Sequence, residues 1–137
     1  MRYRLIDHTA DIGVVLEAAD GPSLFENAAF ALFDLLTDLK RVEGRQSLTL
    51  DVTGQDWPDL MVAWMRELLY LWVGRGLLVG SARVEGLEEF RLGATLAVEP
   101  FDPERHVIKT EIKAVTYHQL AVAPGPEGWR AQIVFDI

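Results

Sequence analysis

The sequence predicts an α+β fold in which two amphipathic helices pack on one face of a single mixed β-sheet. Two stretches, residues 24–39 and the segment between Asp56 and Gly76, repeat apolar residues at spacings of three and four, which is typical of helices with one buried face. Much of the remaining chain alternates apolar and polar residues with a period of two, as half-buried strands do. The 137 residues fit one domain, which we assign to residues 1–137.

Two strands are expected at the amino-terminal end, at residues 5–6 and 12–19. A polar stretch, DHTAD at residues 7–11, separates them. The apolar row of the second strand begins at Ile12, so alternation places Asp11 on the opposite face. Asp11 is therefore directed away from the main apolar face and is available to a polar site.

The first helix is predicted over residues 24–39. Gly21 and Pro22 end the strand before it. Ser23 and Glu26 have the spacing of a capping box, in which the Ser23 hydroxyl accepts a hydrogen bond from the amide three residues on and the Glu26 side chain reaches back. We therefore expect Ser23 to be the N-cap of this helix.

A strand is expected at residues 48–53, where apolar and polar residues alternate, and the second helix follows it. Asp56 is the predicted N-cap, and a proline follows two residues later, early in the first turn, where its missing amide is tolerated. Gly74 and Gly76 are predicted to end the helix.

The rest of the chain is predicted to be mainly β, with turn residues between strands at residues 77–84, 90–98, 107–115, 118–123 and 129–135. When the alternation of the last strand is continued to the chain end, Phe135 and Ile137 share its apolar face and Asp136 lies on its polar face. Burial of Phe135 and Ile137 would fix the chain end. It would then order the Asp136 carboxylate and the terminal carboxylate beside it.

Composition excludes several classes of function. The chain has 13 Lys and Arg against 21 Asp and Glu, a net charge of −8, so we expect no direct nucleic-acid binding. It has no cysteine, so a metal must be bound by oxygen or imidazole. No apolar stretch suggests a signal peptide or a membrane span, and we expect a cytoplasmic location without membrane attachment. Phosphate-binding glycine loops, nucleophile elbows and zinc-protease motifs are also absent.

Three separated segments offer polar groups that one site could collect: residues 7–11, the KAVTYH stretch at residues 113–118, and Asp136 with the terminal carboxylate of Ile137. Converging carboxylates repel each other unless a cation neutralises them. The hypothesis is a site for a hard divalent cation, for which all-oxygen ligation suits calcium, magnesium or manganese.

Structural explanations for the same residues stay open. Asp7 and Asp11 also suit an Asx turn, and Asp136 suits a solvated residue near a frayed terminus. Lys113 also fits the exposed face of an ordinary strand. His106 follows an Asp-Pro-Glu-Arg stretch and is predicted to face water in a loop.

Taken together, HTAD at residues 8–11, the SLFE helix start, KAVTYH and the terminal FDI closely resemble the archease family from end to end. Archeases are accessory proteins that activate an RtcB-type RNA ligase in tRNA splicing and RNA repair, promoting its GTP-dependent guanylylation and multiple turnover. The resemblance therefore implies a protein cofactor rather than an enzyme. The chain departs from the family pattern at residues 98–102, VEPFD, so no site residue is expected in that loop.

The resemblance also implies a ligand set. In the family a divalent metal, calcium in structures, is bound at positions that correspond here to Asp11, Asp136 and Ile137. His8, Lys113 and His118 would orient the acids or contact the ligase.

Two other functions remain open. One is a metal-dependent phosphoesterase that uses Asp11 and Asp136 for the ion and His118 as acid or base. The other is a chaperone-like interaction domain whose acidic residues only keep the protein soluble.

Overall fold

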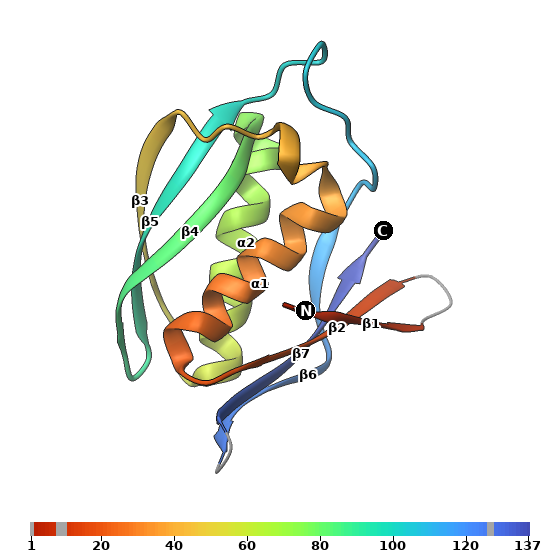
Figure 1. The fold of residues 1–137 in the computed structure, drawn as a ribbon. Coiled ribbons are helices and arrows are strands. Elements are labelled where there is room, and N and C mark those ends of the chain that lie inside the picture. Colours follow the sequence, from red (N-terminus) through yellow and green to blue (C-terminus); the bar gives the residue numbers. More distant parts are fainter. Residues whose placement is uncertain (1, 8–10, 126–127) are drawn as a thin grey trace.

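The computed structural model describes residues 2–7, 11–125 and 128–137, and places two α-helices between two antiparallel β-sheets (Figure 1). The helices are α1 (Gly21–Leu36) and α2 (Trp57–Arg75), and a short 3-10 helix, η1, spans Leu39–Arg41. The four-stranded sheet has the order β1-β2-β7-β6, with strands Arg4–Asp7, Asp11–Ala18, Gly128–Asp136 and Ala114–Gly125. The three-stranded sheet has the order β3-β5-β4, with strands Gln46–Thr53, Arg91–Pro100 and Leu77–Glu88.

The predicted α+β class and its two helices are confirmed, but the single mixed sheet is wrong. Helix α1 contacts β4 of one sheet and β2 of the other, and α2 contacts β6 and β3. The physical reason lies in α1, which buries apolar residues on more than one side, including Ala28, Ala31 and Phe33. Such a helix needs a layer on each side, so the strands divide into two sheets.

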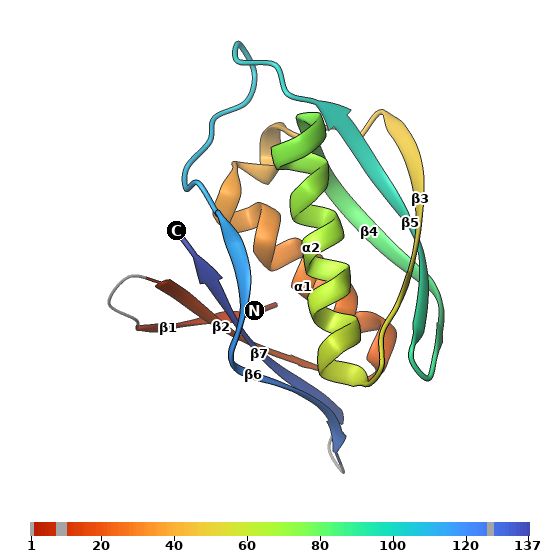
Figure 2. The ribbon, with the colours of Figure 1, turned by 180° about the vertical axis from the view of Figure 1, so that it is seen from behind.

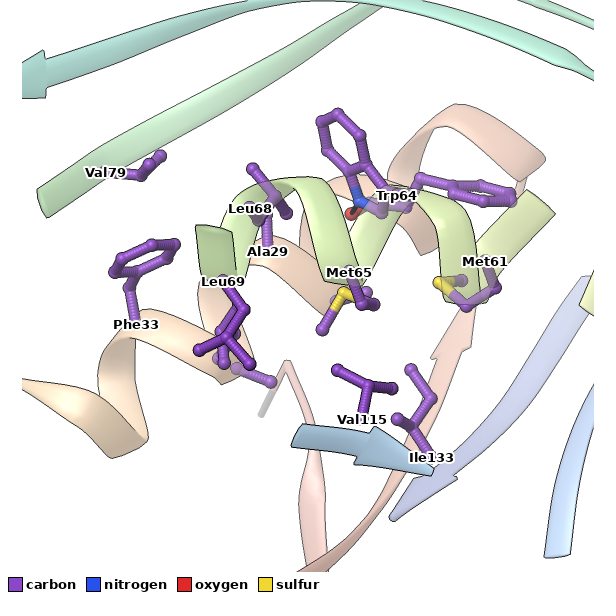
Figure 3. Close-up of a cluster of buried hydrophobic side chains, with 14 of the residues drawn as sticks. Ala29, Phe33, Met61, Trp64, Met65, Leu68, Leu69, Val79, Val115 and Ile133 are labelled. Carbon is purple, nitrogen blue, oxygen red and sulfur yellow. Dashed lines mark hydrogen bonds between the residues drawn. The ribbon is translucent and has the colours of Figure 1, made fainter. Parts of the chain in front are cut away.

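The helix layer and both sheets share one hydrophobic core (Figure 3). Trp64, Met65 and Leu68 of α2 and Phe33 of α1 all belong to it. Val79 of β4 contributes from one sheet, and Val115 of β6 and Ile133 of β7 contribute from the other. The backs of both sheets face outward, away from the helices (Figure 2).

The start of α1 differs from the predicted capping box. The N-cap is Asp20, whose carboxylate accepts a hydrogen bond of 2.8 Å from the Ser23 amide. Pro22 lies in the first turn, where no amide hydrogen is needed, so the helix can begin before Ser23. Glu26 does not reach back but accepts a 2.9 Å hydrogen bond from the amide of Val84 in β4.

The start of α2 confirms the sequence prediction. The Asp56 carboxylate caps it through a 2.8 Å hydrogen bond from the Asp59 amide. At the other end Gly76 adopts the left-handed conformation with φ of 65°, which glycine reaches without steric penalty. Gly74 lies inside the helix rather than at its end.

The predicted strand at residues 107–115 is wrong, because β6 begins only at Ala114. Residues 101–113, called the strap below, join β5 to β6 in extended and turn conformations, with one isolated bridge between Ile108 and Thr37. The alternation in this segment reflects burial of Ile112 in the core rather than a ladder. β6 then continues through the break expected near residue 117, with a register shift between Thr116 and Ala121.

Within the described part of the chain, neither α1 nor α2 is long and apolar enough to span a membrane.

Candidate functional site

The pairing of β2 with β7 places Asp11 directly opposite Asp136. The register runs without interruption from this pair to Ala18 opposite Trp129. Residues directly opposite in an antiparallel pair lie on the same face, with Cβ atoms about 4.5–5.5 Å apart. Two carboxylates from opposite ends of the sequence therefore meet at one end of the four-stranded sheet.

The neighbouring residues decide which face carries these carboxylates. Phe135 lies opposite Ile12, is fully buried and packs with the helices. Because successive residues of a strand point to opposite faces, Asp11 and Asp136 belong to the outer face. A shift of β7 by one residue would turn Phe135 outward. The burial of Phe135 therefore fixes the register between β2 and β7.

The two acids are electrostatically linked. The pKa of Asp136 is raised above its ordinary value of 3.8, chiefly because its carboxyl group shares a side-chain hydrogen bond with Asp11. Partial desolvation and the charge of Asp11 act in the same direction, and the nearby Lys113 opposes them. A cation bound between the two carboxylates would remove the repulsion between them.

A third segment places the positively charged Lys113 beside the pair, just before β6. Asp136 lies opposite Ala114 of β6, and its carbonyl oxygen accepts a 2.7 Å hydrogen bond from the Lys113 amide. The Lys113 side chain is exposed. The structure therefore brings Asp11, Lys113 and Asp136 together, as the three-segment hypothesis requires.

The other predicted site residues are Ile137, His8 and His118, and the structure describes only Ile137 in full. Ile137 follows the last residue of β7 and its side chain is 43% exposed, so its predicted burial is wrong, whereas that of Phe135 is confirmed. The reason is that β7 ends at Asp136, which leaves Ile137 beyond the ladder. His8 lies outside the described residues, and the side chain of His118 does as well, although its backbone belongs to β6.

The donor set suits a partly hydrated hard cation. In the described ranges no group of three or more His, Asp or Glu side chains is close enough to hold a metal ion. A cation held here by the Asp11 and Asp136 carboxylates would complete its shell with main-chain oxygens or water, and the terminal carboxyl group of Ile137 follows Asp136 directly. Carboxylate oxygens with water completing the shell are typical of magnesium, manganese and calcium sites.

A second polar cluster was not predicted at all. His106 was expected to face water, but its side chain is fully buried, 3.1 Å from Glu99 Oε1 through Nε2. Glu99 is itself 3% exposed and pairs with Arg105, and it accepts a 2.5 Å hydrogen bond from the Glu43 amide. The sequence gives one indication of this cluster: Glu99 lies near the end of the apolar strand β5, and Arg105 and His106 follow it closely. A buried acid needs charged or hydrogen-bonding partners, and these two residues can supply them.

Hydrogen bonding assigns the tautomer of His106. Its Nδ1 accepts a 2.9 Å hydrogen bond from the Asp102 amide, so Nδ1 carries no proton and Nε2–H donates to Glu99. Burial alone would raise the pKa of Glu99. The Glu43 amide, His106 and Arg105 together outweigh burial and lower the pKa below its ordinary value of 4.5.

This cluster predicts an acid-sensitive component of stability. Since the Glu99 pKa is lowered by folding, its contribution is present above pH 4.5 and is lost as the pH falls through the folded pKa. Glu99→Gln should lower the unfolding free energy by about 2 kcal/mol at pH 7 and by much less at pH 3. Urea unfolding at both pH values measures this, with the exposed Glu104→Gln as control. An equal loss at both pH values would contradict the assignment.

Comparison with known proteins gives one consistent family. Residues 3–137 match a family model described as Archease protein family (MTH1598/TM1083). Relatives named "Protein archease" include those of Methanosarcina acetivorans, 37% identical over 99% of this chain and 96% of theirs, and Thermococcus gammatolerans, 38% identical over 99% of each. The solution structure of Methanobacterium thermoautotrophicum protein 1598 superposes with a TM-score of 0.82 at 26% identity, covering 99% of both chains.

Proposed function

Because this chain belongs to the archease protein family, we propose that it is an accessory protein that activates an RtcB-type RNA ligase in tRNA splicing and RNA repair. In this role it promotes GTP-dependent guanylylation of the ligase and multiple turnover, and it catalyses no reaction by itself. The ligase holds the RNA, since a net charge of −8 disfavours binding of RNA by this chain alone.

The pairing of Asp11 with Asp136 is the observation that supports this proposal most directly. Both carboxylates, with the main-chain carboxyl group of Ile137, would hold one divalent cation, either calcium, magnesium or manganese. When bound, such an ion supplies a positive centre able to neutralise the phosphates of a nucleotide. A carboxyl group must be deprotonated to bind it, so the raised pKa of Asp136 couples cation affinity to pH.

The position of the site suits an accessory protein. Asp136 is exposed and lies at the end of β7 on an outer sheet face, where a second macromolecule can reach it. Lys113 beside it adds one positive charge next to two negative ones. Lys113 would therefore limit cation affinity and offer a contact to an acidic group or phosphate of the partner.

The test is a guanylylation assay with ligase, GTP and either wild-type protein or the Asp11→Asn or Asp136→Asn variant. Each substitution removes one charged ligand at nearly constant volume. We expect the initial rate of guanylylation to fall by at least about tenfold, because the loss of one ligand weakens metal binding at least that much. A matched control is Glu17→Gln, which removes a charge from the same strand, β2, near Arg130.

Undiminished guanylylation with Asp11→Asn and Asp136→Asn would eliminate the cation-site mechanism. The purified chain alone should hydrolyse no phosphoester. Turnover that depends on Asp11 would instead identify a phosphoesterase.

A further inference from the structure

The strap, residues 101–113, connects β5 to β6 by crossing the ends of both helices, and it leads to the candidate site (Figures 1 and 2). It forms no continuous ladder with a neighbouring strand, and its isolated bridge joins Ile108 to Thr37. Extended segments without a ladder keep one conformation only where other contacts hold them. The contacts along the strap therefore determine how well ordered its last residue, Lys113, is.

The first half of the strap is held by buried polar groups. Phe101 donates its amide to Gly76 O at 2.8 Å and contacts the Trp72 ring edge-on, with 5.3 Å between ring centroids. His106 closes the following turn through the Asp102 amide and is held by Glu99. Residues 101–106 are therefore fixed to β5 and to the end of α2.

The middle of the strap is held by the end of α1. Thr37 is fully buried, and its hydroxyl donates to the Val107 carbonyl at 2.5 Å. The carbonyl of Leu36 accepts a 2.8 Å hydrogen bond from the Lys109 amide. Thr37 is the residue that ends α1, so its side chain is free to bind the strap instead of the helix.

The end of the strap is fastened to the candidate site itself. Ile112 is 3% exposed in the core, and the Lys113 amide donates to the Asp136 carbonyl at 2.7 Å. That bond lies at the last rung of β7, beyond which the ladder stops. Asp136 is thus bonded to β2 on one side and to the strap on the other.

We propose that Thr37 is a positioning residue for the Asp11–Asp136 pair. Its hydroxyl fixes the strap, the strap fixes Lys113, and Lys113 holds the last rung of β7 so that Asp136 stays opposite Asp11. Strand ends fray unless they are held. If the end of β7 frays, Asp136 lies opposite Asp11 in only a fraction of the molecules. The apparent cation affinity is then reduced by that fraction. The expected effect on cation affinity rests on the proposed function, whereas the expected effect of Thr37 on the ordering of Asp136 does not.

The experiment compares Thr37→Val, which keeps the shape but removes the hydroxyl, with Thr37→Ser, which keeps the hydroxyl. Two quantities are measured: the hydrogen-exchange rate of the Lys113 amide by NMR, and the affinity for Mn²⁺ by calorimetry. In Thr37→Val we expect exchange roughly fivefold faster or more, and Mn²⁺ affinity several-fold weaker. Thr37→Ser should stay within about twofold of wild type in both.

The Val52→Ala variant is the control for a general loss of stability. Val52 is buried in the three-stranded sheet, so this substitution should destabilise the protein without changing a contact of the strap. Exchange at Lys113 that is unchanged in Thr37→Val, or equally accelerated in Val52→Ala, would overturn the positioning role. If the wild-type protein binds no Mn²⁺, the proposed cation site fails, and the exchange rates alone decide whether Thr37 orders Asp136.

Discussion

Asp136→Asn is expected to weaken divalent-cation binding by about 100-fold or more and, at the same time, to stabilise the cation-free protein near neutral pH. The first effect follows from the loss of one of two side-chain ligands. The second follows from the pKa of Asp136, which folding raises above 3.8. For such an acid the stabilising contribution is present below pH 3.8 and is lost as the pH rises through the folded pKa.

The side-chain amide introduced by this substitution carries no charge and can still donate a hydrogen bond to Asp11, so the repulsion present in the wild type disappears. Thermal unfolding with a chelator should show the variant to be more stable than wild type at pH 7 and nearly equal to it at pH 3. Glu17→Gln, in the same sheet, should show neither effect. A variant that is less stable at pH 7, or that binds cations as wild type does, would contradict the account.

Phe135→Ala should lower the free energy of unfolding by about 3–5 kcal/mol, the range for removing a fully buried aromatic side chain. Phe135 has no exposed surface and belongs to the common core. Its removal should also weaken cation binding, because it is the inward residue next to Asp136. Chemical denaturation and Mn²⁺ titration measure the two effects.

The control for this prediction is Phe135→Leu, which keeps most of the buried volume and should cost less than about 1.5 kcal/mol. A loss below about 1 kcal/mol for Phe135→Ala would mean that the ring does not point into the core. The register of β7 would then differ by one residue, and Asp136 would lie on the inner face.

The predictions confirmed by the structure rest on local physics. The Asp56 cap, the left-handed Gly76 and the three-and-four spacing of α2 involve residues within a few positions of one another. The division into two sheets could not be predicted in this way, because a period of two shows that a strand is half buried without saying which sheet it joins. Ala31 and Phe33, two residues apart and so on nearly opposite sides of α1, are both apolar and both buried, and this is the feature that marks a second layer.

The candidate site was predicted in outline for a similar reason. Alternation alone placed Asp11 and Asp136 on the polar faces of their strands, and the pairing of β2 with β7 brings them opposite each other. The roles of Thr37 and His106 could not be predicted, because each depends on a partner far away in the sequence or on a loop whose path the sequence does not reveal. Long-range polar contacts of this kind have no periodic signature.

The most direct test of the central claim is the location of Mn²⁺ by anomalous X-ray scattering from crystals of the wild-type protein soaked in the ion. The account predicts one strong peak between the carboxylates of Asp11 and Asp136, at about 2.0–2.6 Å from oxygen ligands, and no such peak in Asp136→Asn. A peak elsewhere on the molecule, or no peak at this end of β2 and β7, would contradict it.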